Sequence, residues 1–374
     1  MINRAEAEVD LSAIASNVKR IRAIAGVPVM AVVKANAYGH GLVPIAETAI
    51  AAGAQWLGVA LLEEALALRG AGISAPILCW LNPPGSDFLG AIRADIDLAV
   101  PSIQIYEEIV LASQLAGRPA RIHIEVDTGM TRGGFLDEWE SFVELIGKAN
   151  EDVEIVGIFS HFARADEPRV EQNAQQLKRF TEMSDDLNRV GVEPALHHLA
   201  NSAATLVDAS SHFDLVRVGI ATYGLTPDRG NLGSSQSLGL RPAMTLRAKL
   251  HLVKKVPAHS YVGYGAAAQT ERDTVIGVVA IGYADGIPRI ATGAGVLSHG
   301  NKAPILGRVS MDQFVVDLGP DSRAKAGEWV TIFSSGEDGG YTADDWGKAS
   351  QSINYEIVTR IGERVPRVYL QVTR

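Results

Sequence analysis

The stretch PVMAVVKANAYGHG, residues 28–41, joins an apolar run to a single lysine, Lys34, and then to a small polar loop. A short apolar run with β-branched residues, bounded by turn residues, predicts a buried strand. Similar runs recur downstream, and segments with helical spacing, such as LEEALALRGAG and VEQNAQQLKRFTEMSDDLNRVG, lie between them. The eight expected strands are PVMAVV, WLGVAL, APILCWL, DLAV, RIHIEV, EIVGIFSHF, ALHHLA and LVRVGI. Eight strands that each precede a helical stretch predict a (β/α)8 barrel.

A doubly wound open sheet is the alternative to the barrel. Such a sheet would place a GxGxxG loop after its first strand if it bound a dinucleotide. The loop after PVMAVV instead reads KANAYGHG, which weakens the dinucleotide interpretation.

The pattern changes after TPDRGNLGSSQSLGL, a stretch rich in Gly and Ser that we interpret as a linker. Beyond it, MTLRAKLHLVKKV, TVIGVVAIGY, APILGRVSMDQFVVDLG and EWVTIFSS resemble strands, and TADDWGKASQSI resembles one helix. We therefore expect an α/β chain in which residues 1–234 form the barrel domain and residues 235–374 form a mainly β C-terminal domain. The first residues are expected to be able to pair with that β domain.

Composition limits the partners and the compartment. The formal net charge is −9 and the charged residues, 21% of the chain, are not clustered, which argues against nucleic acid and anionic membranes as partners. The N-terminus MINRAEAEVD lacks the apolar core of a signal peptide, and the apolar runs are too short to span a bilayer. The single cysteine, Cys79, cannot form an internal disulfide. We expect a cytoplasmic protein.

Polar residues stand where the expected strands end, which in a barrel of this kind is where catalytic groups lie. Lys34 ends the first strand. One interpretation is a lysine that snorkels at the barrel rim. The other is a lysine in a desolvated pocket, whose neutral amine can form a Schiff base. Possible neighbours at later strand ends are His161, His198, Asn201, Ser202, Arg217 and Gly219.

The combination of these residues resembles the alanine racemases, which are pyridoxal-phosphate enzymes. VKANAYGHG resembles the cofactor-lysine signature of that family, and matching motifs run from EAEVDLSAIASNV to INYEIVTRIGERVPRVY across both expected domains. The resemblance implies that Lys34 carries pyridoxal phosphate. It further implies a cofactor site made of Lys34, Tyr38, His161, Asn201, Ser202, Arg217, Gly219, Ile220 and Tyr355.

Within that site the resemblance places Arg217 opposite the pyridine nitrogen of the cofactor and His161 beside the ring. An arginine donates hydrogen bonds and does not accept a proton. The pyridine nitrogen would therefore stay unprotonated, and the cofactor would be a weaker electron sink than it is opposite a carboxylate. This suits a reaction that only removes and replaces one proton.

Racemisation requires a base on each face of a planar intermediate, and the resemblance assigns Lys34 to the D-isomer and Tyr264 to the L-isomer. Tyr264 lies in YVGYGAAAQ, where only the match to the family's Tyr-Gly-Ala step distinguishes it from Tyr261. In the family this tyrosine comes from the other subunit of a head-to-tail homodimer with shared active sites. The product, D-alanine, would supply peptidoglycan synthesis.

For the substrate, a small amino acid, the resemblance implies carboxylate binding by Arg132 in EVDTGMTRGGF and by Met311 and Asp312 in GRVSMDQF, with Tyr283 at the entryway. No metal is implied. Many members of the family carry a carbamylated lysine two residues before DTGM, and this chain has Glu125 there. We hypothesise that the Glu125 carboxylate supplies the same negative charge and orients Arg132.

Three alternatives remain. A pyridoxal-phosphate decarboxylase of the same architecture would place a carboxylate opposite the pyridine nitrogen and a cysteine in the second domain, whereas this chain has Arg217 and only Cys79. A non-catalytic carrier of pyridoxal phosphate would not need Tyr264 or the RVSMDQ loop. A racemase of serine or of a broader range of amino acids would be distinguished by turnover on those substrates.

Overall fold

The computed structural model describes residues 3–148 and 151–370. The chain forms two compact units. The barrel unit comprises Ile14–Ala37 and Leu42–Leu240, and the C-terminal unit comprises Met1–Ala13, Tyr38–Gly41 and Arg241–Arg374.

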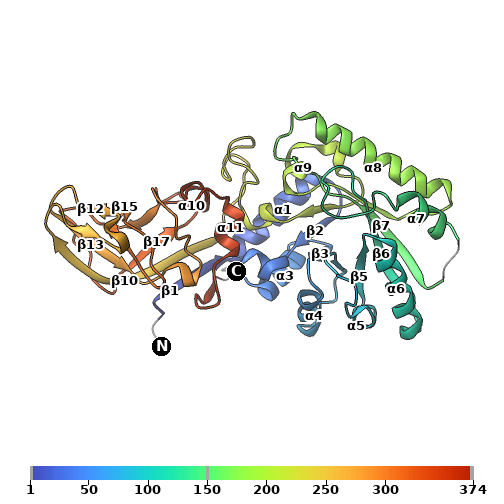
Figure 1. Cartoon of the computed structure of the whole chain (residues 1–374), viewed down its shortest axis with the longest axis horizontal. Helices are drawn as coiled ribbons and strands as arrows, with labels where there is room; N and C mark the ends of the chain where they lie inside the picture. The colour runs from blue at the N-terminus through green and yellow to red at the C-terminus, as the bar shows by residue number, and fades with distance from the viewer. Residues whose placement is uncertain (1–2, 149–150, 371–374) are drawn as a thin grey trace. The chain divides into compact units, whose positions relative to one another are not determined.

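Eight parallel strands build the barrel unit in the order β8-β7-β6-β5-β4-β3-β2-β9 (Figure 1). They are β2 (Val29–Val32), β3 (Trp56–Val59), β4 (Ile77–Cys79), β5 (Ile96–Val100), β6 (Ala120–Glu125), β7 (Val153–Phe159), β8 (Leu196–His198) and β9 (Val216–Val218). The backbone N–H of Arg217 donates to the carbonyl of Ala200 at 2.9 Å, so β9 also approaches the end of β8. The predicted (β/α)8 class is confirmed, and each predicted strand run overlaps one of these strands.

Helices follow the strands and lie on their outer side, as α4 to α8 do in Figure 1. The helical segments are α1 (Leu11–Ala25), α3 (Leu42–Ala51), α4 (Leu62–Gly70), α5 (Phe88–Arg93), α6 (Ile103–Ala116), α7 (Trp139–Ile146), α8 (Glu171–Arg189), α9 (Ser202–Val207), η1 (Ala209–Ser211) and η2 (Ile220–Tyr223), and the segment α2 (Lys34–Tyr38) is a left-handed turn. Helix α8 illustrates why the helices pack against the strands. Its residues Gln176, Phe180, Met183 and Leu187 are spaced at three or four residues and are all buried. The opposite side of α8 stays polar.

The interior of the barrel is apolar around a few polar side chains. All five residues of β5 are buried, as expected of a parallel strand covered on both faces. Met30, Trp56, Leu78, Val156 and Leu215 form one buried cluster. The few polar side chains in the barrel interior contribute to the site described below.

The C-terminal unit is mainly β, as predicted. Strand β10 (Met244–Val256) spans the predicted run MTLRAKLHLVKKV and pairs with β1, β17 and β13, so that β10-β17-β14-β15-β16-β13 closes on itself. The other elements are β1 (Ala5–Asp10), β11 (Tyr261–Val262), η3 (Tyr264–Ala266), β12 (Ala268–Gln269), β13 (Thr274–Val279), η4 (Tyr283–Asp285), β14 (Gly295–Ser298), β15 (Asn301–Leu306), β16 (Phe314–Asp317), β17 (Trp329–Phe333), α10 (Ala343–Ala349), α11 (Asn354–Thr359) and β18 (Arg367–Leu370).

Two details of this unit differ from the sequence prediction. The run APILGRVSMDQFVVDLG is not one strand, because a loop over residues 307–313 separates β15 from β16. A second helix, α11, follows α10. Its sequence NYEIVT has little helical propensity, and burial of Ile357 and Val358 accounts for the helix instead.

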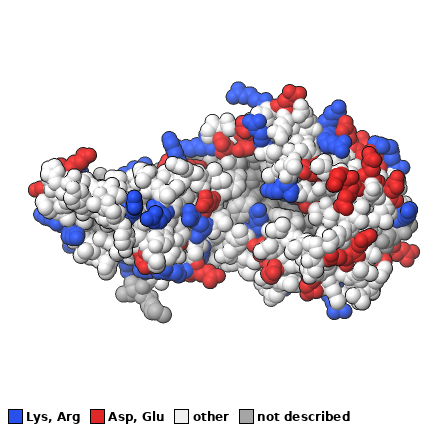
Figure 2. All heavy atoms as spheres, in the orientation of Figure 1, with Lys and Arg blue, Asp and Glu red and all other residues white. Residues whose placement is uncertain are grey.

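Charged side chains of both signs are interspersed over the face of each unit shown in Figure 2. Among the described residues, no helix has both the length and the apolar character needed to cross a membrane.

Candidate active site

The residues after β2 form a left-handed turn that begins with Lys34. Ala35, Asn36, Ala37 and Tyr38 have φ angles of 53°, 54°, 53° and 51°. Residues with a Cβ adopt this conformation at a cost of about 1–2 kcal/mol each. Four in succession mark a turn that the surrounding structure holds in place, and such strain is concentrated at functional sites.

Hydrogen bonds within the barrel unit account for this turn. The side chain of Glu64 accepts from the backbone N–H of Ala35 at 2.5 Å. The side chain of Asn36 accepts from the N–H of Leu42 at 2.8 Å, and the N–H of Ala37 donates to the carbonyl of Val33 at 2.8 Å. The sequence analysis did not identify Glu64 or Asn36. In the sequence, only the short polar segment KANAYGHG indicated a turn at this place.

The second half of the motif, Tyr38–Gly41, belongs to the C-terminal unit, where its glycines make close approaches. A Cβ on Gly39 would lie 2.2 Å from the carbonyl oxygen of Val358, and a Cβ on Gly41 would lie 1.8 Å from the hydroxyl of Tyr369. Both glycines also have positive φ. The positive φ favours glycine at both positions, and at Gly39 a Cβ would also collide with the backbone.

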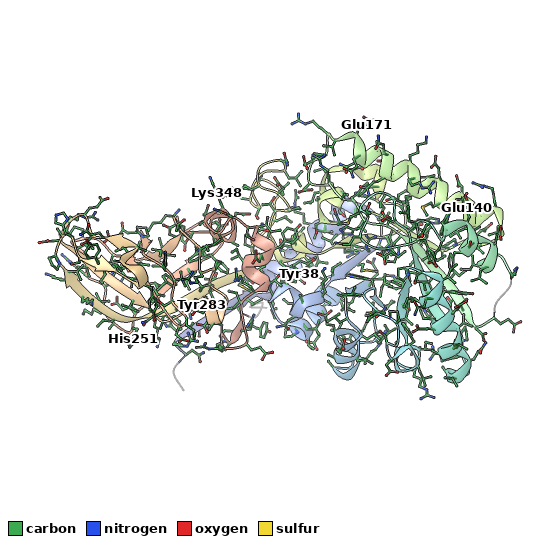
Figure 3. The ribbon with its side chains drawn as sticks, viewed as in Figure 1. Tyr38, Glu140, Glu171, His251, Tyr283 and Lys348 are labelled. Atoms are coloured by element: carbon green, nitrogen blue, oxygen red, sulfur yellow. The ribbon has the colours of Figure 1, made fainter. Side chains whose placement is uncertain are left out.

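Two of the predicted phosphate-binding residues meet in the C-terminal unit. Tyr38 lies beside α11 (Figure 3), and its ring centroid is 6.3 Å from that of Tyr355. Burial raises the pKa of the Tyr38 phenol, so Tyr38 stays a neutral hydroxyl that can donate a hydrogen bond.

The surroundings of Lys34 lower the pKa of its amine. Burial lowers the pKa of the amine, the positive charge of Arg132 lowers it further, and Glu64 opposes these effects. A lysine of this kind is a better nucleophile than an exposed one. The direction of this pKa shift favours the desolvated-lysine interpretation over snorkelling at the rim.

Arg217, on β9, is buried and holds a fixed position at the ends of the last strands. Its guanidinium donates to the carbonyls of His198 and Ser160, each at 2.6 Å, and to Nδ1 of His161 at 3.3 Å. Burial lowers the pKa of Arg217 to about 10, and Glu125 partly offsets this. The same burial, together with Arg217, lowers the pKa of His161 to about 3. A neutral imidazole thus stands next to a charged guanidinium.

Glu125 ends β6 and shares this region with Arg217 and Arg132. Burial raises the pKa of its carboxyl to about 7, and the two arginines partly offset the effect. The turn that carries Arg132 is shaped by Asp127, whose carboxylate accepts from the N–H groups of Gly129, Met130 and Thr131. The structure therefore places Glu125 and Arg132 in one electrostatic cluster.

A group of backbone amides converges at Ser202, the first residue of α9. Ser202 Oγ accepts from the N–H of Gly219 at 3.0 Å and from the N–H of Ala221 at 3.4 Å. The side chain of Asn201 caps α9 by accepting from the N–H of Ala204 at 3.1 Å. Ile220 lies between the two converging amides and is buried. A hydroxyl with converging N–H groups is suited to binding an anion.

The predicted substrate-binding residues of the C-terminal unit lie on two adjacent loops. The N–H of Tyr283 donates to the carbonyl of Ser310 at 3.0 Å, and a Cβ on Gly282 would lie 2.4 Å from the carbonyl oxygen of Met311. Asp312 accepts from Arg364 at 2.6 Å. The Asp312 side chain is thus engaged in an ion pair within this unit. The structure brings Tyr283, Met311 and Asp312 together here.

Tyr264 lies on η3 between two glycines with positive φ, Gly263 and Gly265. Tyr264 is 71% exposed, while Met311 is 54% and Tyr283 38% exposed.

The predicted site residues therefore form two groups. The barrel unit carries Lys34, Arg132, His161, Asn201, Ser202, Arg217, Gly219 and Ile220, and the C-terminal unit carries Tyr38, Tyr264, Tyr283, Met311, Asp312 and Tyr355. Cys79 lies outside both groups: burial raises the pKa of its thiol to about 12, so the thiol does not act as a nucleophile.

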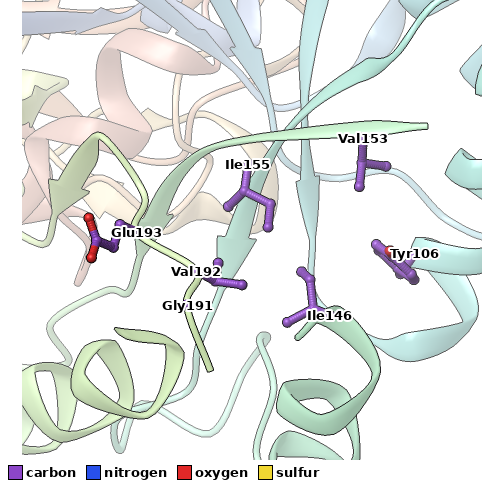
Figure 4. Close-up of a pocket in the computed structure, with 7 residues that line it drawn as sticks. All are labelled: Tyr106, Ile146, Val153, Ile155, Gly191, Val192 and Glu193. Carbon is purple, nitrogen blue, oxygen red and sulfur yellow. The ribbon is translucent and has the colours of Figure 1, made fainter. Parts of the chain in front are cut away.

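A cavity of about 270 Å³ elsewhere in the barrel unit is lined by Tyr106, Ile146, Val153, Ile155, Gly191, Val192 and Glu193 (Figure 4). Val153 begins β7, whereas His161 follows the end of that strand. The seven residues of β7 place the two ends about 20 Å apart. The cavity thus lies at the amino end of the strand, away from the groups that converge at its carboxyl end.

Comparison with known proteins agrees with this arrangement. The family model "Alanine racemase, N-terminal domain" matches residues 9–227, and "Alanine racemase, C-terminal domain" matches residues 243–369. A relative from Beutenbergia cavernae named alanine racemase is 50% identical over 373 residues, which cover 98% of each chain.

Solved structures show the same likeness. The alanine racemase from D-cycloserine-producing Streptomyces lavendulae is 49% identical, has a TM-score of 0.97, and the match covers 99% of this chain and 98% of that one. The alanine racemase from Bacillus anthracis with bound L-Ala-P is 38% identical, has a TM-score of 0.91, and the match covers 100% and 97% of the two chains. The resemblance inferred from VKANAYGHG is confirmed: the chain belongs to the alanine racemase family.

Proposed function

We propose that the chain interconverts L-alanine and D-alanine with pyridoxal phosphate as its cofactor. The observation that carries this proposal is the register of two neighbouring strands. Ala31 of β2 pairs with Val218 of β9. Lys34, whose amine has a lowered pKa, and Gly219, which points its N–H at Ser202, therefore follow adjacent carboxyl ends.

Each part of pyridoxal phosphate finds a chemical match among the residues present. The amine of Lys34 suits the aldehyde, because its lowered pKa increases the fraction of neutral, nucleophilic amine. Ser202 with the N–H groups of Gly219 and Ala221 suits the phosphate, and Tyr38 and Tyr355 would add two hydroxyl donors. Arg217 suits the pyridine nitrogen, since it offers a donor and no acceptor. His161 would lie beside the pyridine ring, and Asn201 would lie next to the phosphate-binding group of Ser202, Gly219 and Ala221.

When bound, pyridoxal phosphate supplies a conjugated ring that withdraws electrons from the substrate Cα and so acidifies its proton. Lys34 would hold the cofactor through its amine, and the same amine would take up or return the Cα proton of the substrate on one face. Arg217 would keep its proton and donate to the pyridine nitrogen, which would limit how far negative charge spreads from Cα.

The substrate carboxylate would be bound by the guanidinium of Arg132 and the backbone amide of Met311. Glu125 lies in the same charge cluster as Arg132 and would orient it. Asp312 supports this loop through its ion pair with Arg364, and Tyr283 lies against the same loop at the substrate entryway.

The second base is Tyr264, and it would act in a homodimer with shared active sites. We infer that the partner subunit's Tyr264 serves the L-isomer while Lys34 serves the D-isomer. The 71% exposure of Tyr264 in the single chain leaves its ring accessible to a second copy. The D-alanine produced would serve peptidoglycan synthesis.

Reductive trapping tests cofactor attachment. The full chain is incubated with pyridoxal phosphate, reduced with borohydride and mapped by mass spectrometry, and turnover of alanine is measured on the unreduced sample. We expect the pyridoxyl group on Lys34 and its absence in Lys34→Ala. Label on other lysines alone, or none, would refute the assignment of Lys34.

A further inference from the structure

A chain of buried polar side chains crosses the barrel interior and ends at Arg217. Nη1 of Arg217 lies 3.2 Å from Nδ1 of His198, Nε2 of His198 lies 2.9 Å from Nδ1 of His123, and Nε2 of His123 lies 3.3 Å from Oδ2 of Asp97. The four residues come from β9, β8, β6 and β5, and each is at most 6% exposed. None of the roles proposed above involves Asp97 or His123.

The hydrogen bonds of this chain have only one consistent direction. Burial lowers the pKa of His123 and of His198, so both rings are neutral and each has one donor and one acceptor nitrogen. Arg217 can only donate, so Nδ1 of His198 accepts and its Nε2 carries the hydrogen. His198 then donates to Nδ1 of His123, and Nε2 of His123 donates to the Asp97 carboxylate.

Neighbouring residues hold the side chains of this hydrogen-bonded chain in place. Arg121 donates from Nε to Oδ1 of Asp97 at 2.9 Å and from Nη2 to Oδ2 at 3.2 Å. The ring of Phe159 stacks on His198 with centroids 5.1 Å apart and planes 9° apart. Gly157 leaves room for His123, since a Cβ there would lie 2.6 Å from Nδ1. A fixed anion thus stands at one end and a fixed cation at the other.

We propose that Asp97 is a positioning residue that sets the tautomers of His123 and His198 and thereby gives Arg217 an acceptor on its buried side. When the hydrogen bonds run from Arg217 to Asp97, Nδ1 of His198 accepts from Arg217, and Arg217 keeps its place at the strand ends. With the direction reversed, Nδ1 of His198 would carry a hydrogen and oppose the N–H of Arg217. The catalytic consequence rests on the proposed function, in which Arg217 faces the pyridine nitrogen.

The variant Asp97→Asn tests this direction. Arg121 donates to both oxygens of Asp97, and its shorter bond, 2.9 Å from Nε to Oδ1 against 3.2 Å from Nη2 to Oδ2, is expected to keep the asparagine oxygen at the Oδ1 position, so that the amide NH2 faces His123. His123 must then accept, and both tautomers reverse. Asp95→Asn is the matched control, because Asp95 lies two residues from Asp97, directly before β5, and forms an exposed ion pair with Arg118. Its positive φ is one that asparagine readily adopts.

The measurement is a nitrogen-15 NMR spectrum of the histidine-labelled full chain, with the signals of His123 and His198 assigned through their loss in His→Gln variants. We expect the hydrogen on Nε2 of both rings in the wild type and in Asp95→Asn, and on Nδ1 in Asp97→Asn. A hydrogen on Nδ1 of either ring in the wild type overturns the proposal, and this result needs no variant to fold. Unchanged tautomers in Asp97→Asn overturn it as well.

Kinetics separate the positioning role from the proposed function. For Asp97→Asn we expect kcat/KM for alanine to fall by roughly 10- to 100-fold, the scale known for groups that orient ligand histidines, and to stay at the wild-type value in Asp95→Asn. Reversed tautomers with unchanged kcat/KM would refute positioning. A wild-type chain that shows the expected tautomers but does not racemise alanine would refute the proposed function and leave the direction of the chain established.

Discussion

The carboxylate of Glu64 accepts a hydrogen bond from the backbone N–H of Ala35, the residue that follows Lys34. Its other oxygen accepts from the N–H groups of Ala60 and Leu61, at 3.0 Å and 3.1 Å, and so caps α4. One side chain therefore ties the left-handed turn after β2 to the helix after β3. The position of Lys34 depends on this link.

Replacing Glu64 by Ala should destabilise the protein by roughly 2–3 kcal/mol, because it removes the acceptor of three backbone N–H groups. Loss of order in the turn should also weaken cofactor retention by Lys34. Urea unfolding measures the first effect and dialysis of the loaded protein measures the second. Glu63→Ala is the control, since Glu63 is an exposed neighbour on the same helical turn. Equal stability of the two variants would contradict the account.

Ala35→Gly tests the strain of the left-handed turn. Ala35 has a φ of 53°, which disfavours a residue with a Cβ by about 1–2 kcal/mol, whereas glycine loses about 0.5–1 kcal/mol through its freer unfolded state. We expect the variant to be equal to or slightly more stable than the wild type. Ala31→Gly, in the buried strand β2, should instead be destabilised. Thermal unfolding of both variants decides, and a clear loss of stability in Ala35→Gly would show that the turn is not strained.

The sequence contained enough information to predict the barrel and the mainly β unit, because burial imposes regular patterns on strands. The eight apolar runs from PVMAVV to LVRVGI each overlap one barrel strand. Lys34, His161 and Arg217 could be placed at strand ends for the same reason. Their roles came from the match to a family signature and stay predictions.

The remaining features depend on long-range contacts that have no local pattern. The left-handed turn is held by Glu64, which lies about 30 residues from it and resembles any other acidic residue of an amphipathic helix. Helix α11 forms because tertiary packing overrides weak propensity. Asp97 stands in an apolar run, and only the arrangement of β5, β6 and β8 brings it to His123 and, through that ring, to His198.

Glu125→Gln tests the buried carboxyl near Arg132. In the folded chain the pKa of Glu125 is raised from 4.5 to about 7, so the stability associated with its protonated form is present below 4.5 and is lost as the pH rises through 7. The 2.5-unit shift corresponds to roughly 3 kcal/mol. Relative to the wild type, Glu125→Gln should therefore gain about that much unfolding free energy between pH 4.5 and about pH 8, measured by denaturant unfolding of the cofactor-free protein.

The same variant should bind substrate less well, because Arg132 loses the anion that orients it. We expect a higher KM for alanine and no response of either protein to added bicarbonate. A pH-independent stability difference would place Glu125 in solvent rather than in the charge cluster. Wild-type KM in Glu125→Gln would refute its role as the replacement of a carbamylated lysine.

Tyr264→Phe tests the second base. Removing a positioned acid–base group typically lowers the rate by about 10²- to 10⁴-fold. Racemisation should fall in this range, while exchange of the Cα hydrogen of D-alanine with deuterated solvent should continue, since Lys34 serves that isomer. Tyr261→Phe is the matched control, as Tyr261 is 72% exposed against 71% for Tyr264. Equal effects of both variants would remove the assignment of Tyr264.

The most direct test of the central claim follows the circular-dichroism signal of L-alanine in the presence of the purified chain and pyridoxal phosphate. Because enantiomers have equal free energy, the account predicts decay of the signal to zero, without release of carbon dioxide or pyruvate, and no decay with Lys34→Ala. A protein that retains the cofactor and leaves the L-alanine signal unchanged would contradict alanine as the substrate. Decay accompanied by carbon dioxide or pyruvate would contradict racemisation as the reaction.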